Sequence, residues 1–328
     1  MLKTEKHFSW HSFLDRFTPL LALAVIFSFF SLAAPDQFTT PQNLTTIANH
    51  AAIIAILTLA LTFILIAGKM DLSLGAIFSL AAAAPFFLLK FHTQHFPPQT
   101  IVPLTILAIL LLCSIAGLIN GLLVTRIKAP AFAITLATAM ILLTAANQFP
   151  APAEPGIPFL KNIWTWPTTP HWPFVPPAVW TAIILIASSA ALLKFTRLGR
   201  HICATGSSEE TANYCAVQIN RIRIFVFSLA ALLTAVAAIL SLSNPAAAPH
   251  NPQNLTILPL AAALFAGTSL KGGKGSITST IITACAISAL LNGLEIINLQ
   301  PWLVRTIPAF ILLPALAFDH IRNPRNDH

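Results

Sequence analysis

Apolar runs of about 20 residues alternate with short polar connections along almost the whole chain. A helix that crosses a bilayer needs about 20 predominantly apolar residues, so these runs are long enough to span. The pattern therefore predicts an all-α polytopic membrane protein with about ten transmembrane helices. We expect them at residues 17–34, 45–67, 72–89, 101–124, 131–148, 177–196, 224–243, 254–270, 276–295 and 302–318.

Composition places the chain in the same class. Of its 328 residues, 56% are hydrophobic and 9% are charged, whereas soluble domains carry about 25% charged residues. A soluble globule and a disordered chain are both excluded by these values. The net charge of +8 would suit nucleic-acid binding in a soluble protein, but here the basic residues fall between the apolar runs. We therefore expect a lipid bilayer around the chain and no nucleic-acid partner.

The distribution of Lys and Arg predicts the orientation. With ten spans and a cytoplasmic N-terminus, 15 of the 18 basic residues fall on the cytoplasmic side and 3 on the outer side. Both termini are therefore predicted to be cytoplasmic, with an N-terminal segment over 1–16, a transmembrane domain over 17–319 and a tail over 320–328. No small-residue cleavage site follows the first apolar run, so we expect a retained helix rather than a signal peptide.

Two connections are long. Residues 149–177 are predicted to lie outside, and they hold nine of the 25 Pro residues, which disfavour a regular helix. Residues 197–223 are predicted to be cytoplasmic. There Ser207 and Glu210 have the spacing of a capping box, which predicts that a short helix begins at Ser207.

The helix predicted from Ser207 is amphipathic. Its polar side carries Glu209, Glu210 and Asn213 rather than Lys or Arg, which favours docking to a partner protein over lying on lipid. Its apolar residues recur at i, i+3, i+4 and i+7, the spacing of one helix face, and are Ala212, Cys215, Ala216 and Ile219.

Several polar residues interrupt the apolar runs. Asp71 lies in a break flanked by Gly68 and Gly75, and it is either a functional residue or the cap of the next helix. Gly121, four residues after Gly117, predicts a face for close helix packing. Polar side chains scattered over several spans are typical of a translocation path, and the candidates are Asp71, Asn120, Thr135, Thr138 and Asn292.

A glycine-rich segment beside two lysines invites a phosphate-binding interpretation. The P-loop pattern G-x-x-x-x-G-K-[ST] fails, because Lys274 is followed by glycine. The signatures H-E-x-x-H and G-x-S-x-G are also missing, as is any cluster of His, Cys and carboxylate residues. We therefore expect neither an enzyme nor a metal site, and tight turns at Gly267, Gly272, Gly273 and Gly275.

Taken in order, five motifs resemble the membrane-spanning permease subunits of bacterial ABC importers for simple sugars, the ribose-permease type. The resemblance runs from about residue 45 to residue 320. The motifs are G-x-x-DLS-x-G at 68–75, NGLLVTR-x-K-x-P-x-F at 120–132, TR-x-GR…A-x-G…EE at 196–210, GTSL-x-GG-x-GS at 267–276 and NGL at 292–294. The sequence departs from the family pattern at Lys69, where a second glycine is usual, and at Ala137.

The resemblance implies the ABC importer permease fold in the bacterial inner membrane. It further implies a second permease copy (identical or a close paralogue), a cytoplasmic ATPase subunit and a periplasmic sugar-binding protein. ATP and Mg would be bound by the ATPase, so this chain would hold no cofactor. The helix within 197–223 would be the coupling helix, and the residues implied to contact the ATPase are Gly206, Ser207, Glu209, Glu210 and Asn213.

The expected function is therefore the translocation pore of an ATP-driven importer, for a monosaccharide, working by alternating access. The alternative is an ion-coupled secondary transporter of a small polar solute. Such transporters bind the coupling ion near a broken helix, and Asp71 would be the candidate residue.

Overall fold

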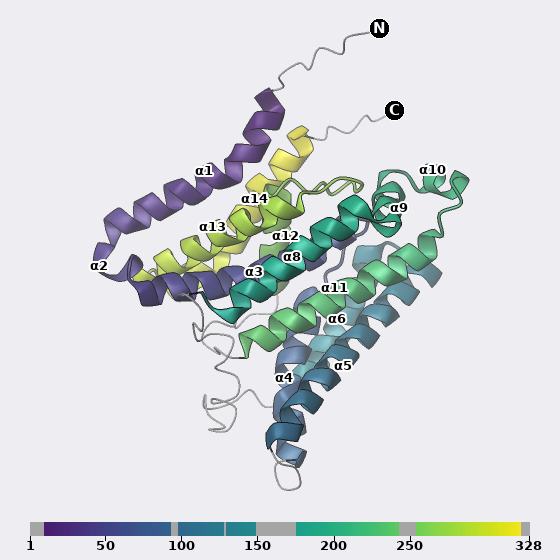
Figure 1. The fold of residues 1–328 in the computed structure, drawn as a ribbon, viewed down its shortest axis with the longest axis horizontal. Coiled ribbons are helices and arrows are strands. Elements are labelled where there is room, and N and C mark those ends of the chain that lie inside the picture. The colour runs from purple at the N-terminus through teal and green to yellow at the C-terminus, as the bar shows by residue number, and fades with distance from the viewer. Residues whose placement is uncertain (1–9, 93–97, 128, 149–174, 243–253, 323–328) are drawn as a thin grey trace.

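The computed structural model of the protein describes residues 10–92, 98–127, 129–148, 175–242 and 254–322. Within these ranges the regular elements are α-helices and none is a strand (Figure 1). They are α1 (Trp10–Ala33), α2 (Pro35–Phe38), α3 (Pro41–Ile66), α4 (Leu74–His92), α5 (Pro98–Arg126), α6 (Ala131–Asn147), α8 (Pro177–Phe195), α9 (Arg197–Ser207), α10 (Glu209–Tyr214), α11 (Ile219–Ser241), α12 (Asn254–Phe265), α13 (Ile277–Ile296) and α14 (Pro301–Arg322).

Each predicted span overlaps one of these helices, which confirms the all-helical polytopic prediction. Among the described residues, six helices are long and apolar enough to cross a membrane, and they belong to α3, α5, α8, α11, α13 and α14. Four shorter apolar helices lie within α1, α4, α6 and α12. The number of crossings, ten, stays a prediction. The Pro-rich connection 149–177 lies almost wholly outside the described residues.

The predicted span 254–270 is too long. Its helix, α12, ends at Phe265, because the chain turns into the left-handed region at Gly267 (φ 94°). The Thr268 N–H donates to the Ala263 carbonyl, and the Gly267 N–H donates to the Leu264 carbonyl, as in a Schellman C-cap. With 12 residues, α12 is about 18 Å long, shorter than a hydrocarbon core of about 30 Å.

Helix α3 forms the centre of the bundle. It packs against α8, α11, α12 and α13, and its residues from Ala51 to Ile66 are all buried. Such all-round burial explains why the α3 sequence is apolar on every face instead of showing one apolar stripe. The helices packed around α3 therefore fix the positions of the residues at its two ends.

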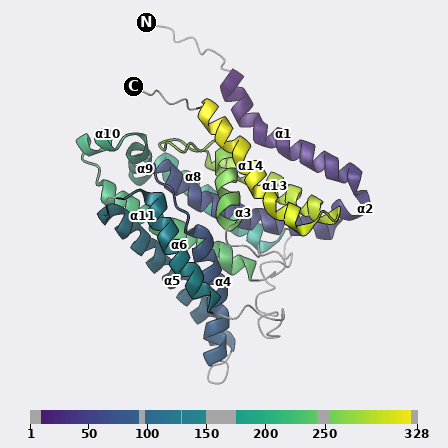
Figure 2. The same cartoon turned by 180° about the vertical axis from the view of Figure 1, so that it is seen from behind.

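Helix α5 packs along α11 (Figure 2). A Cβ on Gly117 would lie 2.5 Å from the Ala231 Cβ, and one on Gly121 would lie 2.8 Å from the Ile224 Cα. Larger side chains at these positions would force the two helices apart. At Gly117 and Gly121, α5 and α11 thus approach as closely as small residues allow.

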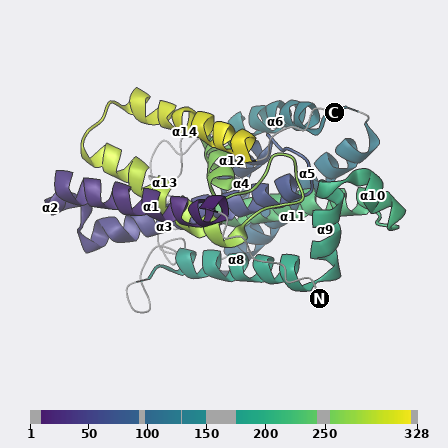
Figure 3. The ribbon, with the colours of Figure 1, turned by 90° about the horizontal axis from the view of Figure 1, so that it is seen from above.

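Helices α9 and α10 lie outside the bundle, between the end of α8 and the start of α11 (Figure 3). The start of α1 and the end of α14 lie towards this same side of the molecule, the upper part of Figure 1. We call it the α9 side. The first residues of α1 and the last residues of α14 thus lie on one side of the bundle, and the predicted cytoplasmic orientation of the termini stays a prediction.

Candidate functional site

The α9 side is built from two short helices in place of the one predicted. Helix α9 is capped by Thr196, whose hydroxyl oxygen accepts a hydrogen bond from the Gly199 N–H at 3.1 Å. Helix α10 is capped by Ser208, whose hydroxyl oxygen accepts from the Thr211 N–H at 3.2 Å. The boundary falls at Ser208 because its extended backbone (φ −161°, ψ 115°) breaks the helix and suits an N-cap.

The predicted capping box of Ser207 and Glu210 is therefore wrong. Ser207 is the last residue of α9, and its hydroxyl donates to the Cys203 carbonyl at 2.9 Å. Two adjacent serines precede two glutamates in the sequence, so the pattern allowed two registers that differ by one residue. The structure adopts the one that begins at Ser208.

The predicted apolar stripe is also wrong. Helix α10 ends at Tyr214, and Ala216 adopts a left-handed conformation (φ 57°) that closes it. Of the four stripe residues, Ala212 is buried in α10, Cys215 and Ala216 are exposed after it, and Ile219 begins α11. A Schellman hydrogen bond from the Val217 N–H to the Ala212 carbonyl ends the helix before the stripe can continue.

The outer surface of α10 is open. Glu210, Asn213 and Tyr214 are exposed, and Tyr214 is 83% exposed, although it is the only Tyr in the chain. A large aromatic side chain on a short surface helix is typical of a residue that anchors a protein interface. Tyr214 is not among the residues predicted to contact a partner, because that prediction rested on the polar and charged residues of the helix.

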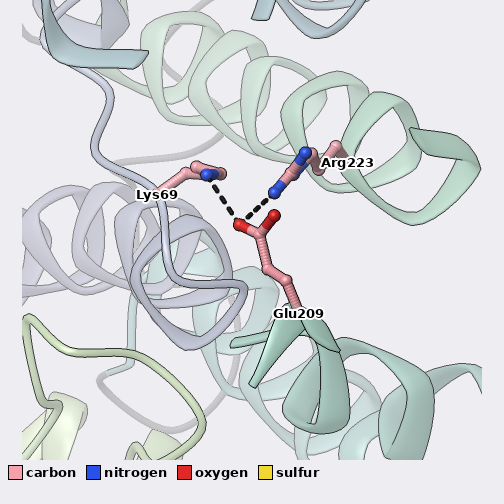
Figure 4. Close-up of polar contacts among 3 residues, drawn as sticks. All are labelled: Lys69, Glu209 and Arg223. Carbon is pink, nitrogen blue, oxygen red and sulfur yellow. Dashed lines mark hydrogen bonds and ion pairs between the residues drawn. The ribbon is translucent and has the colours of Figure 1, made fainter. Parts of the chain in front are cut away.

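Glu209 lies between two cations (Figure 4). Its Oε1 atom accepts a hydrogen bond from the Lys69 Nζ at 2.9 Å and forms an ion pair with the Arg223 guanidinium. The side chains are 24% (Lys69), 51% (Glu209) and 11% (Arg223) exposed. Burial alone would raise the pKa of the Glu209 carboxyl, but the hydrogen bonds and positive charges of Lys69 and Arg223 outweigh it and hold the pKa below its ordinary value.

Beneath this ion pair, three chain segments meet through glycines. A Cβ on Gly206 at the end of α9 would lie 1.8 Å from the Ile66 carbonyl oxygen, and one on Gly272 would lie 2.7 Å from the Gly68 Cα. The Gly273 N–H donates to the Ile66 carbonyl at 2.8 Å, and Gly68, Gly272 and Gly273 all have positive φ values. Gly272 and Gly273 lie in a turn with the positive φ values that favour glycine, and the contacts of the three segments join the ends of α3 and α9 to the α12–α13 connection.

Asp71 lies in the connector between α3 and α4, which we define as residues 67–73. It is 1% exposed, and its Oδ1 accepts from the Ser73 N–H and from the Ser73 hydroxyl, both at 2.6 Å. The first helical bond of α4 ends on the Ser73 carbonyl, so the N-cap of α4 is Ser73 and not Asp71.

Three further hydrogen bonds fix this region to neighbouring helices. The Asn120 side-chain amide of α5 donates to the Ser73 hydroxyl oxygen at 2.7 Å, and the Leu72 N–H donates to the Thr135 hydroxyl oxygen of α6 at 3.0 Å. In the first turn of α4, the Gly75 N–H donates to the Thr256 hydroxyl oxygen of α12 at 3.0 Å. Sequence reasoning found Asp71, Asn120 and Thr135 but missed Thr256, which stands alone in an apolar run.

The five predicted path residues do not form one cluster. Asp71, Asn120 and Thr135 come together, and Thr138 lies one turn along α6, its hydroxyl bonded to the Thr135 carbonyl. Asn292 is elsewhere: its amide exchanges two 2.9 Å hydrogen bonds with Asn43 in the first turn of α3. Because α3 is about 39 Å long, Asn292 and Asp71 lie near opposite ends of the bundle.

Residues 43–316 match the family described as branched-chain amino acid transport system / permease component. The chain belongs to this permease family. The match covers most of α3 and α14 and all the helices between them. These helices carry the α9-side contacts and the group of Asp71, Ser73, Asn120 and Thr135, which we call the Asp71 cluster.

Curated relatives of this permease carry related names. The chain is 28% identical to the ribose import permease protein RbsC of Haemophilus influenzae over 324 residues, 98% of each chain. It is 28% identical to RbsC of Escherichia coli strain K12, over 92% of each chain. It is 30% identical to the autoinducer 2 import system permease protein LsrC of Photorhabdus luminescens, over 92% of this chain and 88% of the relative. The family resemblance predicted from the motifs is thus confirmed.

Proposed function

We propose that this permease is the translocation subunit of an ATP-driven importer for a monosaccharide. The observation that carries the proposal is its similarity to a ribose import permease over 98% of both chains. Such end-to-end similarity favours an importer over an ion-coupled secondary transporter. The permease belongs in the bacterial inner membrane with both termini cytoplasmic, which makes the α9 side its cytoplasmic side.

Energy for transport comes from a cytoplasmic ATPase subunit that docks on α10. Three observations support this surface: α10 protrudes from the bundle, its outer residues Glu210, Asn213 and Tyr214 are exposed, and α9 packs on the end of α3 through Gly206. ATP and Mg are bound by the ATPase, so this chain needs no cofactor of its own. Movement of the docked ATPase displaces α10 and drives alternating access.

The solute path ends, on the cytoplasmic side, at the Asp71 cluster. Sugar hydroxyls need hydrogen-bonding groups to replace water inside a membrane, and Asp71, Asn120, Thr135 and Thr138 place such groups on the connector, α5 and α6. Their mutual hydrogen bonds satisfy them while no solute is bound. At the opposite end of α3, the Asn43–Asn292 pair marks the outer end of the same path.

Two further partners complete the importer. A second permease copy, identical or paralogous, forms the other half of the pore, and a periplasmic sugar-binding protein delivers the solute to the outer side. The bilayer covers the exposed apolar side chains of α5, α6, α8 and α14, among them Ile115, Ile141, Ile184 and Phe310.

Reconstitution tests the proposal. The permease, its ATPase and its binding protein are placed in liposomes, and uptake of labelled D-ribose is measured with ATP or with a proton or sodium gradient. We expect uptake with ATP alone, and none when the ATPase is omitted. Uptake driven by an ion gradient without the ATPase would contradict the proposal and favour the secondary transporter.

A further inference from the structure

We propose that Lys69 is a positioning residue that transmits the movement of α10 to the connector holding Asp71. This inference rests on the proposed function, because it supposes that an ATPase moves α10. It adds a specific route: Glu209 on α10, then Lys69, then residues 70–73 and the helices bonded to them. The route is carried by contacts between segments far apart in the sequence.

The ion pair at Glu209 joins three elements through one atom. Lys69 approaches Glu209 Oε1 from the connector, and Arg223 approaches the same oxygen from the second turn of α11 (Figure 4). Lys69 and Arg223 are both positively charged and repel each other. The Glu209 carboxylate between them attracts both side chains. When α10 moves, Glu209 draws Lys69, Arg223 or both with it.

The connector is short and is held firmly at its far end. Two residues after Lys69, the Asp71 carboxylate binds Ser73, which in turn binds Asn120 of α5. Between them, the Leu72 N–H is bonded to Thr135 of α6. Because these hydrogen bonds and the close packing restrict movement of the connector, a displacement of Lys69 is transmitted to α5 and α6.

The two cations have different roles in this arrangement. Arg223 joins α10 to α11, which directly follows it in the chain, and so it helps to hold α10 in place. Lys69 joins α10 to the connector, and in the described part of α10 no other side-chain hydrogen bond reaches the connector. The structure therefore assigns transmission to Lys69 and anchoring to Arg223.

Lys69→Met separates the two roles. Methionine retains the apolar part of the side chain and removes the charge, and Arg223 still pairs with Glu209. A partly exposed ion pair contributes little to stability, so the variant is expected to fold, insert and bind the ATPase like wild type. Arg223→Gln is the matched partner variant, because it retains the Lys69–Glu209 bond. Lys194→Met, at an exposed lysine on α8, is the surface control.

The experiment measures labelled D-ribose taken up per ATP hydrolysed in proteoliposomes that contain the ATPase and the binding protein. We expect Lys69→Met to lower this ratio by about tenfold, within the usual range of coupling between sites, while ATP hydrolysis continues. Arg223→Gln and Lys194→Met should keep the wild-type ratio. Exchanging the charges, with Lys69→Glu and Glu209→Lys together, should restore much of it.

A second readout follows the connector itself. A cysteine placed at Met70, in a background without the native cysteines, is labelled with and without ATP in the assembled complex. ATP should change the labelling rate when Lys69 is present and leave it unchanged in Lys69→Met. A merely structural bridge would lower ATPase binding in both cation variants and leave the ATP response at position 70 intact.

The outcomes separate the two proposals. Equal losses in Lys69→Met and Arg223→Gln, or a wild-type uptake ratio in Lys69→Met, would overturn the role of Lys69 and leave the importer function standing. A wild-type complex that shows no ATP-dependent uptake and no ATP response at position 70 would overturn the proposed function, and the role of Lys69 with it.

Discussion

At the level of single residues, substitutions of Asp71 test whether the stability of the connector depends on its buried hydrogen bonds. Asp71→Ala removes the acceptor of both Ser73 bonds, and an unsatisfied buried group costs about 1–3 kcal/mol. Asp71→Asn retains an acceptor oxygen and removes the buried charge, so it should lose less stability. Thermal unfolding in detergent would compare them, and equal losses would show that the charge itself, rather than the acceptor, holds the connector.

Glu209 predicts how the α9 side responds to pH. Its pKa is lowered in the folded protein, so its ion pairs stabilise the fold above the ordinary carboxyl pKa of 4.5, and this contribution is lost as the pH falls through the lowered value. Wild type should therefore be more stable than Glu209→Gln near pH 7, with the gap closing below pH 4.5. Melting curves across this range would check it. A gap that widens in acid would contradict the ion-pair assignment.

At the scale of elements, the end of α10 carries a conformational cost. Ala216 has a φ of 57°, where a Cβ is unfavourable, and its side chain is exposed. Ala216→Gly should therefore raise stability by up to about 1 kcal/mol. Gly267→Ala, at the corresponding position after α12, should have the opposite effect. Destabilisation by Ala216→Gly in the same thermal assay would mean that this turn is held by other contacts.

The exposed side of α10 predicts which residues bind the ATPase. Tyr214→Ala should weaken co-purification of the ATPase strongly, because a central aromatic anchor is worth about 2 kcal/mol or more at an interface. Glu210→Lys should weaken it by reversing an exposed charge, without affecting the N-cap at Ser208. Both variants should insert normally, and Thr278→Ala, at an exposed position near the start of α13, is a matched control. Full co-purification with both α10 variants would show that the ATPase docks elsewhere.

At the scale of the whole molecule, topology can be tested with cysteines. On a background free of native cysteines, Gln42→Cys at the start of α3 and Ser208→Cys between α9 and α10 are both exposed. A membrane-impermeant reagent applied from outside should label position 42 and spare position 208, because the charge pattern places the α9 side in the cytoplasm. The reverse pattern would contradict that orientation.

The helices followed from the sequence because apolar run length is a local property, and the ends of α6 and α8 agree with it to within one residue. The contacts between helices could not be predicted from the sequence in this way. Lys69 and Glu209 lie 140 positions apart, and nothing in either local pattern pairs them. Gly68 and Gly272 could be recognised as turn residues, but not as neighbours. The predicted N-cap of α10 was wrong by one residue, because Ser207 and Ser208 carry the same side chain at adjacent positions.

The glycine contacts have a consequence for the order in which the chain can fold during its synthesis. Helix α3 is made early, yet its last carbonyl at Ile66 is bonded to Gly273, and Gly206 packs against it from the end of α9. These partners leave the ribosome only after most of the helices have been made. A nascent chain that stops before the α12–α13 connection therefore carries an α3 end whose Ile66 carbonyl still lacks its Gly273 partner.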